Sequence, residues 1–457
     1  MVLFFKHLLV GQMKHHFLMV CVVLWVFSQI NVAFSAEQSV LKDAGFGIGA
    51  DVRSINREPE GETLLPVSER NFPAFSPKGL IVGKLLVFPK LAVGGFYNDN
   101  LFASSTNEES DSAAVIAPAI SIRTIKDRHF FGMSLSSEIV RYADNHHEDV
   151  ENFEGSAGGY FEIKHDMQLP WKVSYSKYHQ DRANNLSRVF TRDPLEISTA
   201  EVEGGVSYKP NRLGLKVLGR HTRKYFEDGV SLADPAFAVV RSDANFSTTE
   251  LEVETGYEFP ANHVAFLRSV FGETRYDKGI YDDGAAVFTN RFRDSRNISV
   301  LAGVITKYKG LLSSDIGIGY SSINFKDDTI SDVENIAIDA NLDWNITKLS
   351  TLGLDLTRSI IQDNEIVQGI VQTQGTLSLD HELRRQIVLS AYATYINRDF
   401  DGTTREDDLY RMGLEVLYRP SPYYNVKGEY IHSTQNSTFT GNDFERNLFM
   451  IRLTGQY

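Results

Sequence analysis

Apolar and polar side chains alternate with a period of two in many segments after residue 79. In one such segment Ile336, Ile338 and Leu342 are interleaved with Asp339 and Asn341. Because a β-strand projects successive side chains to opposite faces, each segment has one apolar face and one polar face. The pattern therefore predicts amphipathic strands along most of the chain.

The length of these segments indicates where such strands lie. They run for about 10–14 residues, whereas strands of globular proteins usually have about 5–6. A tilted strand that crosses a bilayer needs about 9–11 residues. We therefore expect strands that span a membrane. A soluble all-β sandwich or β-helix is the alternative, and it would need further layers to cover the apolar faces.

Short and long connections alternate between the segments. Short polar turns occur at 126–128, 165–168, 210–212, 260–262, 307–310, 347–349, 381–385 and 419–423. Longer links occur at 98–111, 143–150, 181–196, 228–243, 277–291, 326–333, 363–365, 399–405 and 435–443. Eight turns and nine loops predict an all-β fold, a transmembrane antiparallel up-and-down β-barrel of about 18 strands (16–20). The apolar stretch 79–88 is expected to add or extend a strand.

The first residues have the layout of a targeting segment. Residues 1–35 contain Lys6 and Lys14 but no acidic residue, and an apolar run at 17–27 precedes Ala33-Phe34-Ser35. This predicts a signal peptide over 1–35. A start at Met13 instead of Met1 would leave a more ordinary signal, and a retained membrane anchor is the alternative. Residues 36–78, rich in Gly, Pro and charge, are expected to form a flexible periplasmic segment, and 79–457 the barrel.

Composition narrows the class of protein further. A hydrophobic fraction of 42% excludes general disorder. Cleavage after residue 35 would change the net charge from −13 to −15 and remove Cys21, the only cysteine. The exported chain would then have no disulfide and no thiolate ligand. Its acidity gives no reason to expect nucleic acid as a partner.

The polar faces of the strands predict a charged barrel interior. The inward candidates are Glu201, Glu203, Glu250, Glu252, Glu254, Lys216, Arg220, Lys224, Asp339, Asp343, Arg411 and Glu415. Isolated buried charges are costly, so this interior must be water-filled or internally paired. Both alternatives remain open. The glutamates of 250–254 and 201–203 are expected to form an acidic stripe, with Lys216, Arg220 and Lys224 as a basic stripe of opposed charge between them.

No signature of an enzyme occurs in the sequence. A Gly-x-Ser-x-Gly elbow, a His-Glu-x-x-His helix and a P-loop are all absent. Residues 146–149 (His-His-Glu-Asp) could hold a metal, but they lie in an acidic, solvated loop, and no metal or other cofactor is predicted. A catalytic pair between His179 or His221 and a loop carboxylate remains an alternative.

Two stretches near the start of the predicted barrel carry a family resemblance. They are Gly79–Pro89, followed by Gly95-Phe96-Tyr97-Asn98-Asp99-Asn100-Leu101-Phe102, and then Asp111 with Ile116-Ala117-Pro118-Ala119-Ile120. The chain from about residue 79 to 457 resembles the putative beta-barrel porin 2 family. The resemblance implies an outer-membrane barrel, often associated with exopolysaccharide or capsule production, and no catalytic residues.

The end of the chain suggests how the barrel is assembled. Phe449, Ile451 and Leu453 alternate with polar neighbours, and the last residue is the aromatic Tyr457. Such a strand is expected to be presented to the outer-membrane assembly machinery. We expect a monomer in outer-membrane lipid that acts as a porin-like pore or export conduit for polar or polysaccharide solutes. A structural or polysaccharide-docking barrel is the second hypothesis, and an outer-membrane enzyme the third.

Overall fold

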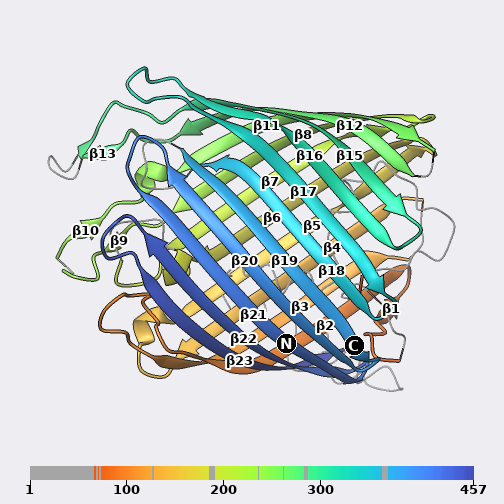
Figure 1. Ribbon diagram of the computed structural model, residues 1–457, viewed down its shortest axis with the longest axis horizontal. Coiled ribbons are helices and arrows are strands. Elements are labelled where there is room, and N and C mark those ends of the chain that lie inside the picture. The colour runs from red at the N-terminus through yellow and green to blue at the C-terminus, as the bar shows by residue number, and fades with distance from the viewer. Residues whose placement is uncertain are drawn as a thin grey trace, which may run out of the picture.

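The computed structural model describes residues 66–67, 70, 74–125, 128–184, 191–234, 236–260, 262–282, 287–362 and 369–457. Eighteen long strands in this part form one antiparallel barrel wall (Figure 1). The first nine are β2 (Leu85–Asn98), β3 (Asp111–Thr124), β4 (Phe130–Tyr142), β5 (Val150–Lys164), β6 (Met167–His179), β7 (Glu196–Tyr208), β8 (Leu213–Phe226), β11 (Phe246–Phe259) and β12 (His263–Tyr276). The other nine are β15 (Ser295–Tyr308), β16 (Leu312–Phe325), β17 (Val333–Thr347), β18 (Ser350–Ile361), β19 (Ile370–Arg384), β20 (Ile387–Phe400), β21 (Glu406–Ser421), β22 (Tyr424–Ser437) and β23 (Phe444–Gln456).

The wall is closed by its first and last strands. Each long strand pairs with the next along the chain, and β23 pairs with β2 from Lys90↔Gln456 to Asn98↔Leu448. Closure satisfies the backbone hydrogen bonds that an open edge would leave unpaired. The predicted all-β, up-and-down barrel of 18 strands is therefore confirmed.

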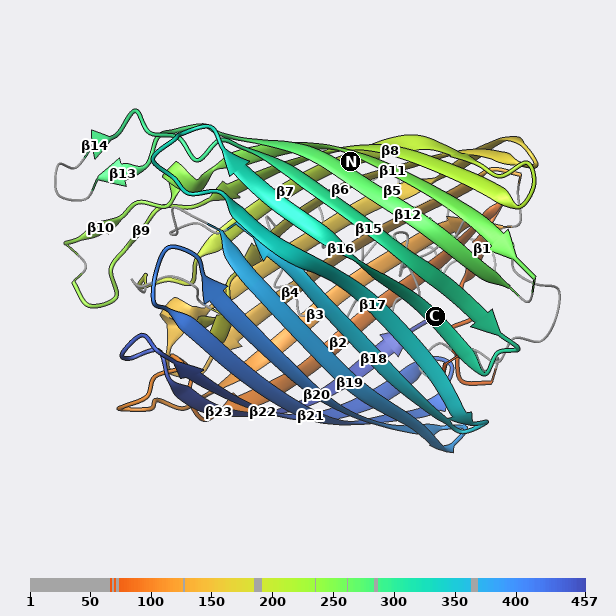
Figure 2. The same ribbon diagram turned by 45° about the horizontal axis from the view of Figure 1, so that its top comes forward.

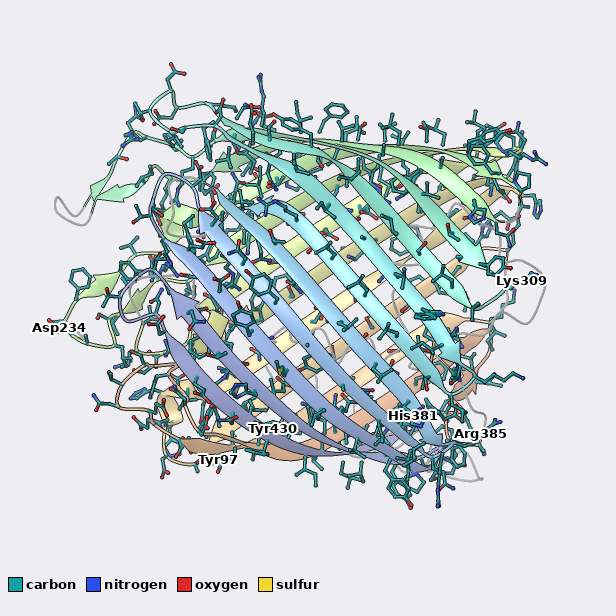
Figure 3. The ribbon with its side chains drawn as sticks, viewed as in Figure 1. Tyr97, Asp234, Lys309, His381, Arg385 and Tyr430 are labelled. Atoms are coloured by element: carbon teal, nitrogen blue, oxygen red, sulfur yellow. The ribbon has the colours of Figure 1, made fainter. Side chains whose placement is uncertain are left out.

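The connections separate the two ends of the barrel (Figure 3). Lys309 and Arg385 belong to tight turns at the short-turn end, where the C-terminus also lies (Figure 1). Asp234 lies at the opposite, long-loop end, where the small hairpins β9 (Gly229–Val230)–β10 (Ala238–Val239) and β13 (Tyr281–Asp282)–β14 (Val287–Phe288) extend the loops. Three short 3₁₀ turns, η3 (His146–Glu148), η4 (Arg182–Asn184) and η5 (Ser242–Ala244), also lie in long loops.

A short strand precedes the barrel wall. β1 (Leu80–Val82) folds back on β2 through a turn in which Gly83 has φ +62°, a conformation that favours glycine. The stretch 79–88 thus both adds a strand and begins β2, as expected. The predicted signal peptide (1–35) and most of the predicted segment 36–78 lie outside the described residues.

Apolar side chains cover the outside of the wall. On β21, Met412 and Leu414 expose 59% and 60% of their surface, and Ile451 on β23 exposes 63%. The strands tilt across this apolar surface (Figure 2). Its apolar character suits lipid rather than water. Within the described ranges, no helix is long and apolar enough to cross a membrane.

Candidate functional site

Charged side chains meet inside the barrel. Arg268 on β12 donates from Nη1 to Asp339 Oδ2 on β17 at 3.1 Å, although β15 and β16 lie between these strands in the wall. Arg452 on β23 likewise reaches Glu138 on β4 at 3.6 Å across β2 and β3. Contacts between strands that are not neighbours can form only on the concave side, so these groups face the interior.

Arg268 is the centre of an interior carboxylate cluster. Its Nε donates to Glu254 Oε2 at 2.7 Å, and its Nη2 lies 3.8 Å from Asp315 Oδ2. The Glu254 side chain is only 1% exposed, whereas that of Asp339 is 42% exposed. The cluster therefore extends from a buried carboxylate on the wall to one in contact with solvent.

A ladder of ion pairs continues along the neighbouring strands. Arg220 on β8 bridges Glu203 on β7 at 2.5 Å and Glu250 on β11 at 3.2 Å. Lys216 pairs with Glu252 at 2.8 Å. Lys172 on β6 pairs with Glu201 on β7 at 2.9 Å, and this pair forms the other end of the ladder.

We call these residues the acidic band: Glu201, Glu203, Glu250, Glu252, Glu254, Asp315 and Asp339, with Lys172, Lys216, Arg220 and Arg268. Seven carboxylates meet four cations, so negative charge is in excess. Lys216 and Arg220 lie between the two sets of glutamates, because β8 is hydrogen-bonded between β7 and β11. Lys224 lies further toward the long loops, over the ring of Phe226.

The remaining predicted interior residues lie on β17 and β21. Asp343 is four residues from Asp339 on β17 and has the same strand parity. On β21, Glu415 pairs with Lys427 of β22 at 2.7 Å, and Arg411 lies four residues nearer the long loops. That these twelve residues act on a solute stays a prediction.

At the long-loop end, residues 181–183 of the β6–β7 loop reach into the interior. Ala183 of this loop packs with Leu409 of β21 and Phe444 of β23. Four strands, β2 to β5, separate β23 from β6 along the wall. Such contacts require these residues of the loop to lie inside the barrel.

Two ion pairs hold this loop in place. Asp181 accepts from Arg446 of β23 at 2.8 Å, and Arg182 pairs with the buried Glu148 of η3 at 2.5 Å. Burial raises the pKa of Glu148, and the Arg182 guanidinium opposes that shift. Arg182 also donates to the carbonyl of Thr191 in its own loop at 2.8 Å. Through Arg182 the β6–β7 loop is thus joined to the β4–β5 loop, which carries Glu148.

The motif that carries the family resemblance also fastens loops. Asp99 accepts from the backbone and side chain of Asn447 on β23, at 2.6 and 2.7 Å. The buried Asn100 donates to the carbonyls of Ser104 and Glu445, both at 2.8 Å. Asp111 accepts from the backbone N–H of Asn145 at 2.8 Å. These polar residues therefore stabilise the mouth of the barrel.

Part of the N-terminal segment contacts the short-turn end. The backbone N–H of Val67, which is 1% exposed, donates to Thr351 Oγ1 at 3.0 Å. Arg70 lies 3.6 Å from Glu382 of β19 and donates to the carbonyl of Lys348. Val67 and Arg70 are thus anchored to β18, β19 and the turn before β18.

The histidines that could serve a metal or an enzyme have separate partners. His147 lies 3.3 Å from Asp193, while Glu148 pairs with Arg182. His179 lies 3.7 Å from Glu196 and contacts Asn152, and His221 contacts Thr249 at 2.9 Å. In the described part of the chain, no three His, Cys, Asp or Glu side chains gather in a group that could hold a metal ion.

Some interior residues were missed by the sequence analysis. Arg268 shares its face of β12 with Val264 and Phe266, which interrupt the polar alternation. Glu382 falls in a segment predicted to be a turn. Arg446 shares its face of β23 with the buried, apolar Phe444. Only the tertiary contacts identify these three residues.

Comparisons with known proteins agree with this architecture. The family model described as Putative beta-barrel porin 2 matches residues 72–457. No curated protein matches the chain.

Three solved structures illustrate the structural likeness. OpdL from Pseudomonas aeruginosa matches with 12% identity over 82% of this chain and 99% of its own, with a TM-score of 0.42. OpdK from Pseudomonas aeruginosa, solved with vanillate, matches with 10% identity over 81% and 99%, with a TM-score of 0.44. A mutant of the ferric enterobactin receptor PfeA from Pseudomonas aeruginosa matches with 8% identity over 81% and 80%, with a TM-score of 0.44. Because the family model covers all eighteen strands of the wall, the chain belongs to the Putative beta-barrel porin 2 family.

Proposed function

We propose that this protein is an outer-membrane passage for polar, carbohydrate-like solutes. The signal peptide at 1–35 would export the chain, and the final strand ending at Tyr457 would present it to the assembly machinery. In this proposal the barrel is a monomer in outer-membrane lipid. The short-turn end faces the periplasm and the long loops face the exterior, as in other bacterial barrels.

The Arg268–Asp339 contact is the observation that carries the proposal. It lies inside the wall, and the Asp339 side chain is 42% exposed, so water reaches a charged interior. Carboxylates in the acidic band can accept hydrogen bonds from sugar hydroxyls, and fixed charges select among ions. Barrels that conduct solutes combine a polar, water-filled interior with an apolar outer wall, and this protein has the same combination.

Conductance measures this function directly. The refolded full chain, reconstituted in a planar bilayer, should give discrete ion currents. The negative excess of the acidic band should make K⁺ more permeant than Cl⁻ in a KCl gradient. Replacement of Asp339 and Asp315 by Asn should reduce this cation preference, whereas Glu273→Gln, at the loop end of β12, serves as the matched control. A correctly folded barrel that never conducts would contradict the proposal.

One observation favours a structural or polymer-docking barrel instead. Residues 181–183 of the β6–β7 loop lie inside the barrel, where Ala183 is in one buried cluster with Leu409 and Phe444. If the loops block the barrel, a strain lacking the protein should keep normal permeability to small sugars but lose surface polysaccharide. Lost permeability with intact surface polymer would favour the passage.

A further inference from the structure

Three polar side chains form a row on the inner wall near the long-loop end. Arg411 of β21 is in register with Ser433 of β22, and Ser433 is in register with Arg446 of β23. All three have the strand parity opposite to the lipid-facing Met412, Leu414 and Ile451. We call them the basic row.

Two groups of the basic row have no hydrogen-bond partner in the part of the chain that the structure describes. Arg411 Nε and Ser433 Oγ are buried, and neither has a hydrogen-bond partner among the described residues. The whole of Ser433 is only 1% exposed. Buried donors without an acceptor are costly, and natural proteins rarely retain them without a reason.

The row is set between apolar neighbours. On the long-loop side lie the buried Leu409 and Phe444 with Gln435 in register between them, and on the other side lie Ile431 and Leu448. Low local polarity strengthens the attraction between a guanidinium and an anion. The surroundings therefore favour an anionic acceptor at the row.

A carboxylate of the protein already occupies this position. Asp181 Oδ1 accepts from Arg446 Nη1 at 2.8 Å and from the backbone N–H of Ala183 at 2.7 Å. Burial would raise the pKa of Asp181, but Arg446, the Ala183 N–H and Arg411 together hold it below its ordinary value. The Asp181 side chain is 39% exposed while that of Arg446 is 5% exposed, so the carboxylate is the accessible partner.

We propose that the basic row is a subsite for the carboxylate of an acidic sugar, such as a hexuronate, and that Asp181 occupies it until the solute arrives. The inference rests on the proposed passage and names its substrate class. The incoming carboxylate replaces Asp181 on Arg446 and supplies the acceptor that Arg411 Nε and Ser433 Oγ lack.

The opposite wall fits the rest of such a solute. In the closed wall of eighteen strands, β11 lies nine strands from β22, directly across the barrel. β11 carries Glu250, Glu252 and Glu254 of the acidic band. Carboxylates accept hydrogen bonds from hydroxyl groups, so the acidic band can bind the hydroxyls of further sugar units of an acidic saccharide when one unit places its carboxylate on the basic row.

Block of the ion current by glucuronate tests the proposal, with glucose as the neutral probe and inorganic phosphate as a second anion. In the full-length, reconstituted barrel, glucuronate should reduce the K⁺ current at concentrations where glucose does not. Asp181→Asn should lower the glucuronate concentration for half-block about tenfold, as expected if Asp181 fills the subsite nine-tenths of the time. Arg446→Gln and Arg411→Gln should each raise it.

Arg452→Gln is the matched control, because it removes one positive charge from the same strand outside the row. Equal effects of Arg452→Gln and Arg446→Gln, or an unchanged Asp181→Asn variant, would overturn the subsite. Block by phosphate equal to that by glucuronate would overturn the carboxylate assignment. Calorimetric titration of the detergent-solubilised barrel with glucuronate gives a second readout. If the wild type binds glucuronate but does not conduct, the passage fails and the subsite stands.

Discussion

Arg268 contacts three carboxylates inside the barrel and neutralises part of their charge. It compensates the buried Glu254 and reaches Asp315 and Asp339 on strands that are not its neighbours. Removing one partner of a buried ion pair leaves an uncompensated charge, which costs far more than the pair contributes. The role of Arg268 is therefore to allow the band to hold more carboxylates than cations.

Arg268→Ala should lower the free energy of unfolding by about 3–5 kcal/mol, because Glu254 then stays buried without its cation. Urea unfolding in detergent, followed by tryptophan fluorescence, measures the change. Arg275→Ala on the same strand is the control, since Arg275 is exposed and pairs with Glu273. Adding Glu254→Gln to Arg268→Ala should recover part of the loss, and no recovery would contradict this account.

Asp181 should make the position of its loop depend on pH. Its pKa is lower when the loop is docked, so docking is favoured above the ordinary value of 3.8 and is lost as pH falls through the lowered pKa. The charged groups around it are Arg446, Arg411 and Glu148. A fluorophore on Asp193→Cys, a position of the same loop where the side chain is 55% exposed, should report undocking in acid. Asp181→Asn should remove this pH dependence, and a transition above pH 5 in the wild type would contradict the assignment.

At the scale of elements, the loops and the N-terminal segment carry the contacts that the wall alone does not explain. Residues 181–183 of the β6–β7 loop lie inside one end, and Val67 and Arg70 contact the other. Glu382 is 4% exposed and lies 3.5 Å from Arg385 of its own turn, and its second cation, at 3.6 Å, is Arg70 of the N-terminal segment. This ion pair fixes the segment immediately before the barrel.

Glu382→Gln should speed tryptic cleavage after Arg70, because the ion pair no longer favours the anchored state. Cleavage of an opening segment follows the population of the open form, and an increase of about tenfold corresponds to about 1.4 kcal/mol. N-terminal sequencing and gel densitometry follow the cut. Glu258→Gln, which breaks the Lys209 pair at the same end, should leave the rate unchanged. Equal acceleration by both variants would exclude a specific anchor.

At the scale of the whole molecule, the barrel reverses the arrangement of a globular protein. Its outer surface is apolar, and its interior holds the acidic band and the basic row. A charge placed on the outer surface is costly in proportion to its depth in the bilayer. This gives a test of membrane insertion that does not depend on transport.

Leu414→Arg, near the middle of β21, should destabilise the folded barrel in lipid by about 2–4 kcal/mol. Tyr424→Arg, at the start of β22, should cost only about 0–1 kcal/mol, because it lies at the interface. Unfolding in lipid vesicles compares the two variants. Equal costs would show that Leu414 does not face hydrocarbon.

The strand pattern was predictable, and the interior contacts only partly so. Period-two alternation and turn residues are local, so they reveal eighteen strands and the parity of Glu250 or Arg220. The pairing of Arg268 with Asp339 depends on how the wall curves across four strands. The position of Asp181 beside Arg446 depends on a loop that reaches into the barrel. Neither curvature nor loop docking leaves a periodic signal in the sequence.

The barrel can close only when β23 pairs with β2. Until β23 has been made, β2 has no partner on one side. Both edges of the growing sheet then expose unpaired backbone amides that another chain could pair with. Loss of the thirteen residues of β23 would therefore do more than shorten the sheet. It would leave an open, curved sheet whose unpaired edges are prone to aggregation and to proteolysis.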